Sequence, residues 1–286
     1  MNGLNMLKPP LKSPEVNLLF DAHTHLQDPR LDGLREDFIR DAAQMGMAGV
    51  CCCGTGPGDW EALTRLCHQP QPLELRPAFG VHPWQVASLP ADWLELLKRA
   101  LDLTPGALLG EIGLDGLRGA MTFEAQLPVL TAQLDLAVER QMPVILHGAR
   151  AWGRLVAVLA RYAEGLPGFV VHSFSGSCEV MQQLLGMGGL ISFSGAICDH
   201  KAVRLRKLVR EVPDSRLLVE TDTPDMFPRD AQAIRVTAHE ELLNQPANLI
   251  CVLRTAAALR STTVESLATL TMSNARRIFG ADANTR

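Results

Sequence analysis

Long apolar runs are missing from this chain of 286 residues. No segment approaches the roughly 20 continuous apolar residues that a membrane-spanning helix needs, so we expect no membrane partner. An excess of positive charge is also missing, because the formal net charge is -4 and the pI is near 6.1. A chain without an overall positive field must hold any polyanionic partner through local contacts.

Paired cysteines are missing as well. Three of the seven cysteines are consecutive, Cys51 to Cys53, but neighbours on a strand point to opposite faces, and no Cys-x-x-Cys pair occurs. The other four stand singly among apolar neighbours, which favours small buried side chains over ligands or nucleophiles. They are Cys67, Cys178, Cys198 and Cys251. This usage indicates a reducing compartment, and we expect a cytoplasmic protein.

Short apolar runs alternate with amphipathic segments along the chain. We predict eight strands over residues 17–23, 48–53, 75–82, 107–111, 143–147, 168–172, 189–194 and 216–222. Helical periodicity predicts helices over 34–45, 60–67, 93–101, 123–140, 152–163, 179–185, 203–212, 247–259 and 264–279. Continuous apolar strands that alternate with helices are typical of a parallel sheet covered on both faces. Eight such units favour an α/β fold of the (β/α)₈ TIM-barrel type over an open doubly wound sheet.

One barrel accounts for nearly the whole sequence. We expect a flexible N-terminal extension over residues 1–16 and a single domain over 17–286, since no composition break marks a second domain. The longest irregular connection, residues 223–233, follows the eighth predicted strand. Long loops of this kind are often functional.

Two histidines, His23 and His25, close the first predicted strand. Side chains two apart on a strand share a face and lie about 6 to 7 Å apart along the backbone, so this pair can bind one metal ion. Taken alone, the motif fits an exposed loop equally well.

Five of the other seven predicted strands also end in imidazole or carboxylate residues. These are His82, Glu111, His147, His172, and the pair Glu220 and Asp222. In a parallel barrel all of these ends lie on one face, where active sites are assembled. The remaining histidines, at 68, 200 and 239, fall outside strand ends and are interpreted as solvated residues.

Four histidines and two carboxylates exceed what one tetrahedral ion needs, whereas two ions about 3.5 to 4 Å apart need a shared acidic bridge. We predict Glu111 as that bridge between two divalent ions, which could be Zn, Mg or Mn. One ion is completed by His23, His25 and Asp222, and the other by His147 and His172. Water or hydroxide between the ions would attack the substrate, with Asp222 as a candidate general base.

Six ordered motifs make the chain resemble the TatD-like metal-dependent hydrolases, from about residue 18 to 280. They are Asp-Ala-His-Thr-His-Leu at 21–26, Gly-Val-His-Pro at 80–83, Gly-Glu-Ile-Gly-Leu-Asp at 110–115, Pro-Val-Ile-Leu-His at 143–147, His-Ser-Phe-Ser-Gly at 172–176 and Glu-Thr-Asp-Thr-Pro at 220–224. The resemblance implies an amidohydrolase-like barrel, a two-metal site on the same six ligands, and 3′–5′ deoxyribonuclease activity. It also implies that His82 lies next to the substrate.

Three positions depart from the family pattern. Ala149 stands where the family usually has an Arg, with Arg150 next to it. Gly116 replaces an aromatic residue, and Gln245 lies in a Leu-Asn-Gln-Pro segment that lacks the family's Arg and acidic residue. None of the departures removes a predicted ligand, but all three bear on how a nucleic-acid phosphate is held.

The leading functional hypothesis is a two-metal phosphodiesterase that acts as a 3′–5′ exodeoxyribonuclease on DNA ends. Arg118 and Arg150 are candidate phosphate contacts, with a solvated helix start as the alternative for each. Trp84, Trp152 and Phe174 follow strand ends and are candidates for base stacking. Five basic residues between 201 and 210 are interpreted as an exposed helix face in preference to a DNA track.

Other functions stay open at this point. The same site suits an amidohydrolase-type enzyme that cleaves a small amide or ester, or a phosphoesterase on a small substrate. Related amidohydrolase barrels often bridge their metals with a modified lysine, so Glu111 favours the phosphoesterase side. A barrel kept only as a metal-dependent interaction module is disfavoured because every predicted ligand is present. We expect a monomer.

Overall fold

The computed structural model describes residues 19–117, 122–229, 231–238 and 240–280. The expected extension over 1–16 lies outside these ranges, as do Arg118 and the histidine at 239.

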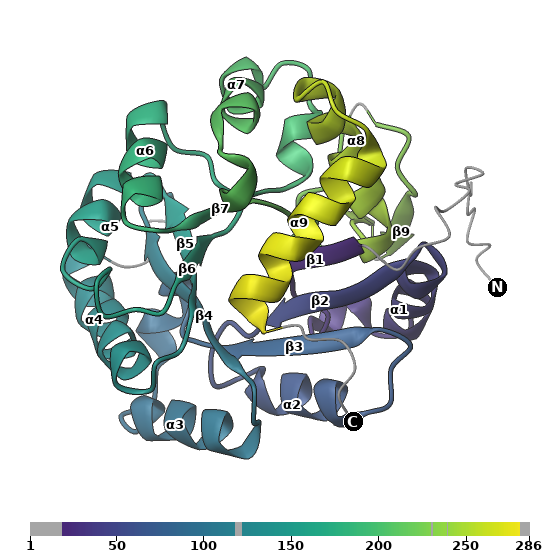
Figure 1. The fold of residues 1–286 in the computed structure, drawn as a ribbon. Helices are drawn as coiled ribbons and strands as arrows, with labels where there is room; N and C mark the ends of the chain where they lie inside the picture. The colour runs from purple at the N-terminus through teal and green to yellow at the C-terminus, as the bar shows by residue number, and fades with distance from the viewer. Residues whose placement is uncertain (1–18, 118–121, 230, 239, 281–286) are drawn as a thin grey trace.

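Eight parallel strands form one sheet in chain order, and each strand pairs with the next (Figure 1). They are β1 (Leu19–Thr24), β2 (Met47–Cys53), β3 (Glu74–Phe79), β4 (Leu108–Asp115), β5 (Val144–Ala149), β6 (Phe169–Val171), β7 (Leu190–Phe193) and β8 (Leu217–Val219). Two backbone bonds join the sheet ends: His25 N donates to Thr223 O at 2.7 Å, and Asp222 N to His23 O at 3.0 Å. The predicted (β/α)₈ barrel is therefore confirmed, and it is almost closed.

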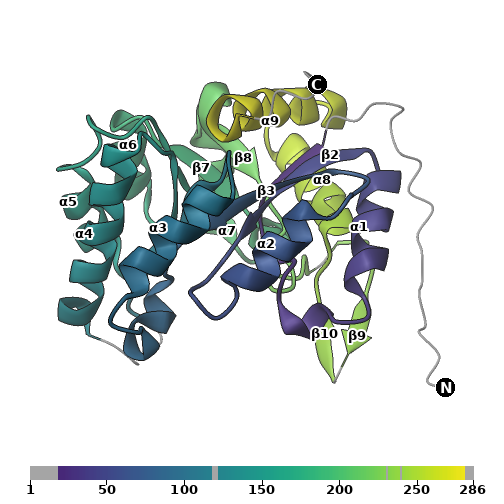
Figure 2. The ribbon, with the colours of Figure 1, turned by 90° about the horizontal axis from the view of Figure 1, so that it is seen from below.

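Helices follow the strands around the outside of the barrel (Figures 1 and 2). They are α1 (Arg35–Gln44), α2 (Trp60–His68), α3 (Trp93–Leu103), α4 (Phe123–Glu139), α5 (Trp152–Leu159), α6 (Cys178–Gly186), α7 (Val203–Glu211), α8 (Leu249–Leu259) and α9 (Val264–Phe279). Their apolar sides pack on the outward side chains of the strands, which is why the strands read as continuous apolar runs. None of the described helices has the length and apolar character needed to cross a membrane.

The last helix, α9, differs from the others because it lies across one end of the barrel (Figure 1). Its residues Met272, Ala275, Ile278 and Phe279 join the apolar cluster inside the barrel. The rings of Phe279 and Phe20 stack with their centroids 5.2 Å apart. Because Phe20 lies near the start of β1, α9 closes the end of the barrel at which the strands begin.

The three consecutive cysteines alternate as expected for a strand. Cys51 and Cys53 lie in the interior cluster, with their Sγ atoms 3.8 Å apart, and Cys52 lies in the outer one. All seven cysteines of the chain are free. Cys198 and Cys251 are buried as predicted, whereas Cys67 and Cys178 are only partly buried.

Some elements differ from the predicted ranges. β4 continues past Glu111 to Asp115, while β6 and β8 stop before the polar residues that follow them. The chain turns there, since Ser173 and Asp222 have φ values of 42° and 57°, in the left-handed region. A hairpin of β9 (Val236–Ala238) and β10 (Glu241–Leu243) was not predicted. Its strands have three residues each, too few for a periodic signal.

Candidate metal centre

A cavity of about 630 Å³ opens at the end of the barrel opposite α9. Six of the residues singled out from the sequence line it: His25, His82, Glu111, His147, His172 and Asp222. His23 lies just beneath and is fully buried. The structure thus brings together residues that are up to 199 positions apart in the sequence, as the barrel predicts.

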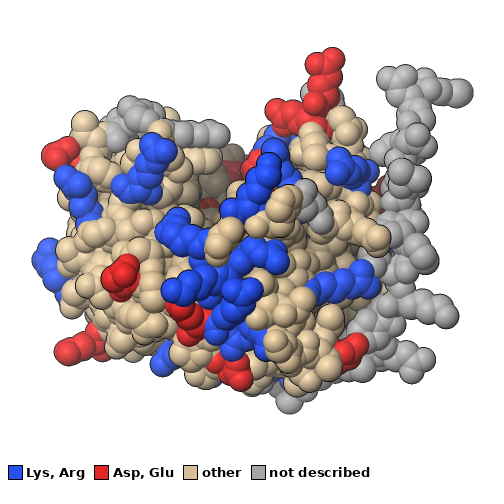
Figure 3. Space-filling model, turned by 90° about the horizontal axis from the view of Figure 1, so that it is seen from above, with Lys and Arg blue, Asp and Glu red and all other residues tan. Residues whose placement is uncertain are grey.

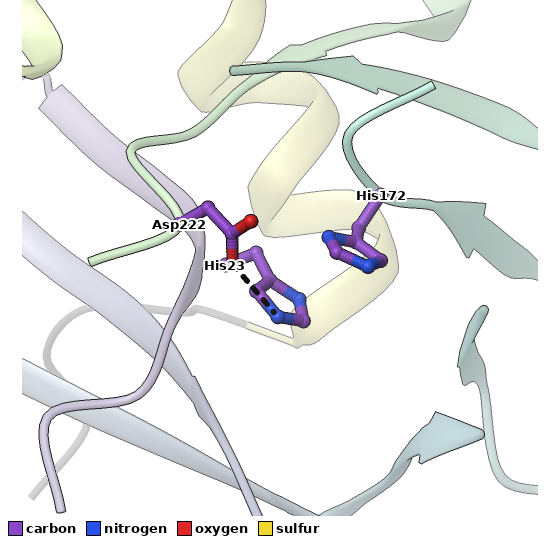
Figure 4. A group of neighbouring side chains, drawn as sticks. All are labelled: His23, His172 and Asp222. Carbon is purple, nitrogen blue, oxygen red and sulfur yellow. Dashed lines mark ion pairs between the residues drawn. The ribbon is translucent and has the colours of Figure 1, made fainter. Parts of the chain in front are cut away.

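His23 and His25 converge as their spacing predicts. Their Nε2 atoms are 3.1 Å apart, and each lies 3.6 Å from Oδ1 of Asp222. Figure 4 shows the Asp222 carboxylate beside the His23 ring, which stacks on the ring of His172 at 3.9 Å. Two ligand atoms on one tetrahedral ion with bonds of about 2.1 Å lie roughly 3.4 Å apart, so this group has the right size for one ion.

Glu111 stands between two groups of imidazoles and turns one carboxylate oxygen to each. Oε2 lies 3.3 Å from Nε2 of His23 and 3.5 Å from Nε2 of His25. Oε1 lies 2.6 Å from Nε2 of His172 and 2.9 Å from Nδ1 of His147. The carboxylate is 2% exposed, so these imidazoles are its principal surroundings.

The second group consists of His147, His172 and His82. Nδ1 of His147 is 3.2 Å from Nε2 of His172, and Nε2 of His82 is 3.5 Å from Oε1 of Glu111. This group depends on close packing of β4 against β5. Gly113 has φ 156°, and a Cβ there would lie 2.0 Å from the carbonyl oxygen of His147. Only glycine allows this approach.

Buried polar groups orient the imidazoles from behind. Nε2 of His147 is 2.9 Å from Oδ2 of Asp115, and Nδ1 of His172 is 3.3 Å from Oε1 of Glu220. Nδ1 of His25 lies 2.7 Å from the carbonyl oxygen of Cys53. Partners of this kind fix the orientation of metal-binding histidines. Asp115 ends the motif at 110–115 but was assigned no role from the sequence, because the predicted fourth strand ended at Glu111.

Burial and charge shift the pKa values of the site in both directions. Burial alone would raise the pKa of Glu111, but the nearby imidazoles, led by His172, hold it well below its usual range. Burial alone would lower the pKa of His172, but Glu111 and Glu220 raise it well above its usual range. Burial dominates for His23 and His82, so the pKa of His23 is lowered and that of His82 falls to about 3. For His147, burial alone would lower the pKa, but hydrogen bonds with Asp115 and Glu111 outweigh it and raise the pKa. Without a metal, Glu111 and His172 therefore form a buried ion pair.

These residues suit divalent ions. Three sets of three donors have ligand atoms within 4.8 Å of one another: His23 with His172 and Asp222, His23 with His25 and Glu111, and His82 with Glu111 and His147. The mixture of imidazole and carboxylate donors is the one used by Zn and similar ions in hydrolases. The Nε2 atoms of His23 and His25 lie 3.1 Å apart, close enough to hydrogen-bond to each other or to bind one shared ion.

The other predicted contacts are more scattered. Arg150 is exposed directly after β5 and does not line the cavity. Among the aromatic candidates only Trp84 is well exposed in the cavity, at 42%, and its Nε1 donates to Asp115. Phe174 lines the cavity but is 1% exposed and packs against Trp152. Arg30, which sequence reasoning missed, lines the cavity and pairs with Asp28 and Asp225.

Two of the three departures from the family pattern are neighbours. The Gly116 amide donates to the carbonyl of Ala149 at 2.7 Å, and Ala149 lines the cavity. A Cβ at Gly116 would lie 3.0 Å from the carbonyl oxygen of Arg150, so little space is left for a larger residue. Gln245 is buried, and its Oε1 has no hydrogen-bond partner among the described residues.

An eight-stranded barrel with clustered imidazoles and carboxylates at the carboxyl ends of its strands defines a metal-dependent hydrolase. Residues 20–280 match the family described as TatD related DNase, and the chain belongs to this family. The resemblance seen in the six motifs is thus confirmed.

Two similar proteins are both named 3′-5′ ssDNA/RNA exonuclease TatD. The protein of Dickeya dadantii (strain 3937) is 33% identical over 262 residues, which cover 91% of this chain and 97% of that protein. The protein of Pantoea ananatis (strain LMG 20103) is 34% identical over 263 residues, with 92% and 99% covered.

Solved structures agree on the fold. YJJV, a TatD homologue from Escherichia coli K12, is 30% identical with a TM-score of 0.82, and the match covers 92% of this chain and 98% of that one. An amidohydrolase from Saccharomyces cerevisiae is 20% identical with a TM-score of 0.74 and covers 91% and 99%. At that identity the second match supports the barrel alone.

Proposed function

We propose that this protein is a divalent-metal-dependent exonuclease that removes nucleotides from the 3′ end of single-stranded DNA. The central observation is Glu111, whose two oxygens face two separate groups of imidazoles. A shared carboxylate between two donor groups is what two-metal phosphodiester hydrolysis requires. The names of the relatives support the 3′–5′ direction and a single-stranded substrate.

Two ions would share Glu111. His23, His25 and Asp222 would complete one, and His147 and His172 the other. Divalent ions held there supply positive charge that stabilises phosphoryl oxygens and lowers the pKa of water. Zn, Mg and Mn all accept this donor set to some degree, and the carboxylates favour Mg and Mn more than the imidazoles do.

The side chains that face the cavity have distinct roles in this proposal. Asp222, 14% exposed, orients the attacking water and accepts its proton. His82 stays neutral because burial lowers its pKa to about 3, so it can donate one hydrogen bond to a substrate oxygen without carrying charge. Trp84 offers an exposed ring for stacking against a base. Arg150 stays our proposed phosphate contact beside Ala149.

Residues 17–286 form one barrel domain in this proposal, and the protein is a monomer. No observation favours the amidohydrolase alternative, and Glu111 at the proposed bridge position favours the nuclease. The small-phosphoester alternative differs only in the size of the substrate.

The test uses purified protein loaded with Mg²⁺, Mn²⁺ or Zn²⁺ and a 20-nucleotide single strand labelled at its 5′ end. We expect a ladder of labelled products that shorten stepwise, and no cleavage of a circular single strand of similar composition. The His25→Ala variant serves as the inactive control. Hydrolysis of dihydroorotate, or of phosphate monoesters alone, with intact DNA would overturn the proposal.

A further inference from the structure

One helix beside the cavity is strongly basic. Residues 201–211 contain five basic residues and one acidic residue, and no stretch of eleven residues elsewhere in the sequence has as many Lys and Arg residues. Lys201 lies two residues before α7, and the other four are in the helix. We call Lys201, Arg204, Arg206, Lys207 and Arg210 the α7 basic face. We propose that the α7 basic face binds the backbone of the nucleic-acid strand that extends out of the cavity, an inference that rests on the proposed exonuclease function.

The α7 basic face is joined to the rim of the cavity. Leu205 of α7 lines the cavity, and so do Ser175 and Ala196. Arg204 donates to the carbonyl oxygen of Ser175 at 2.8 Å and also bonds that of the next residue, Gly176. A strand that leaves the cavity on this side therefore meets positive charge at the rim.

Most of these charges are not neutralised by acidic neighbours. Arg206 and Arg210 donate to the carbonyl oxygens of Ile197 and Leu259, at 2.8 and 3.3 Å, and such bonds leave the positive charge in place. Within the described part of the chain, only Lys207 of the five has a carboxylate within ion-pair distance, Glu211 at 3.6 Å.

Helix α1 shows the opposite arrangement, although it also carries two arginines. Arg35 pairs with Asp32 at 2.7 Å, and Arg40 pairs with Asp37. The basic character of α7 is therefore a local property of this side of the barrel, in a chain whose net charge is -4. Figure 3 shows Lys and Arg gathered on the face where α7 lies, beside a hollow in the surface.

The direction of α7 suits a surface that binds an extended nucleic-acid strand. The helix follows β7 through the short turn Gly195–Cys198, so it begins at the cavity end of the barrel and runs down the outer wall. Nine residues span about 13 Å. Successive phosphates on a duplex strand are separated by about 3.4 Å along the axis, so a polynucleotide can place more than one phosphate along α7. A dinucleotide held in the cavity cannot.

The test compares two triple variants of the full chain. The α7 variant combines Lys201→Gln, Lys207→Gln and Arg210→Gln, which leaves the rim contacts of Arg204 and Arg206 intact. The control variant combines Arg65→Gln, Lys98→Gln and Arg99→Gln on α2 and α3, on the opposite side of the barrel (Figure 1). Thermal unfolding establishes that both variants fold.

Affinity for a fluorescent 20-nucleotide single strand is measured in EDTA, which stops hydrolysis. Loss of three phosphate contacts should lower the slope of log K against log salt by about 2, since each contact contributes about 0.7 on single strands. We expect about tenfold weaker binding of the 20-mer by the α7 variant near physiological salt, and wild-type binding by the control. With metal, KM for the 20-mer should rise similarly while kcat/KM for a dinucleotide stays unchanged.

The inference is overturned if the two variants bind the 20-mer equally well, or if the α7 variant loses the same factor on the 20-mer and the dinucleotide. The proposed function fails separately if the wild-type protein hydrolyses no nucleic acid. In that case binding in EDTA still tests the α7 basic face. A slope of log K against log salt that is lower only in the α7 variant supports the inference, and absence of binding refutes it.

Discussion

Replacing Glu111 with Gln tests the bridge that the proposed mechanism requires. The substitution keeps the shape of the side chain but replaces one oxygen with an amide NH₂, which cannot bind a metal. In the structure Oε1 is 2.6 Å from a nitrogen of His172 and Oε2 is 3.3 Å from one of His23. Whichever way the amide turns, one of the two imidazole groups loses its shared acidic partner.

The size of the effect follows from these contacts. Loss of a single preorganised charge-stabilising group costs about 10²- to 10³-fold in kcat, or roughly 3 to 4 kcal/mol. Because Glu111 would serve both ions and also supplies a full negative charge, we expect a loss of at least about 10³-fold. Metal content should fall from two ions per chain to one or none. Glu111→Ala should show the same loss.

The assay combines kcat on a single-stranded 20-mer with metal content measured by mass spectrometry after gel filtration. Glu220→Gln is a matched control, because Glu220 is also a buried carboxylate but faces the outer nitrogen of His172. The Glu220→Gln substitution should weaken metal affinity about 10- to 100-fold, and added metal should restore turnover. Wild-type turnover by Glu111→Gln with two ions bound would refute the bridge.

Four further predictions concern the surroundings of the site. Asp115→Asn should weaken metal affinity by about 10- to 100-fold in an equilibrium titration, because its carboxylate orients His147; full activity at limiting metal would count against that role. Trp84→Ala should raise KM for single-stranded DNA about tenfold with kcat little changed, since a stacked base contributes roughly 1 to 3 kcal/mol; an unchanged KM would exclude stacking. Metal affinity should rise with pH and metal binding should release protons, because the raised pKa of His172 keeps this residue protonated without metal. Calorimetry in buffers of different ionisation enthalpy measures the proton release, and finding none would contradict this prediction. Phe279→Ala should lower the free energy of unfolding by about 3 to 5 kcal/mol in urea while kcat at low temperature is retained, since the ring fills the barrel end remote from the cavity; a selective loss of kcat would contradict this.

The sequence was most informative where physical constraints are strong. Parallel strands covered on both faces must be apolar throughout, so runs such as Val144 to Leu146 stood out against the amphipathic helices. The barrel then placed His23 and Asp222 side by side from opposite ends of the chain. Six predicted metal-binding residues consequently meet in one place.

Features that depend on local geometry were less accessible. The role of α9 as a plug could not be read from its pattern, because a helix across a barrel end is as amphipathic as one on the side. Asp115 ends one of the six motifs but received no role from the sequence, because the predicted strand ended at Glu111 whereas β4 continues to Asp115. Arg30 lies in a short 3-10 helix, Pro29–Leu31, and only the folded chain shows that it reaches the cavity.

Substrate contacts were the hardest to predict. A surface arginine that binds phosphate cannot be distinguished in a sequence from one that contacts only water. The position of the cavity was therefore needed to judge Arg150 and the α7 basic face as phosphate contacts. Arg150 turned out to be exposed beside the cavity without lining it. The α7 basic face turned out to adjoin the rim, which sequence alone did not favour.

Anomalous diffraction from crystals grown with Mn²⁺ tests the central claim most directly. Our account predicts two peaks about 3.5 to 4 Å apart. One should lie among His23, His25 and Asp222, the other beside His147 and His172, with Glu111 between them. A single peak, or peaks that do not contact Glu111, would contradict the account.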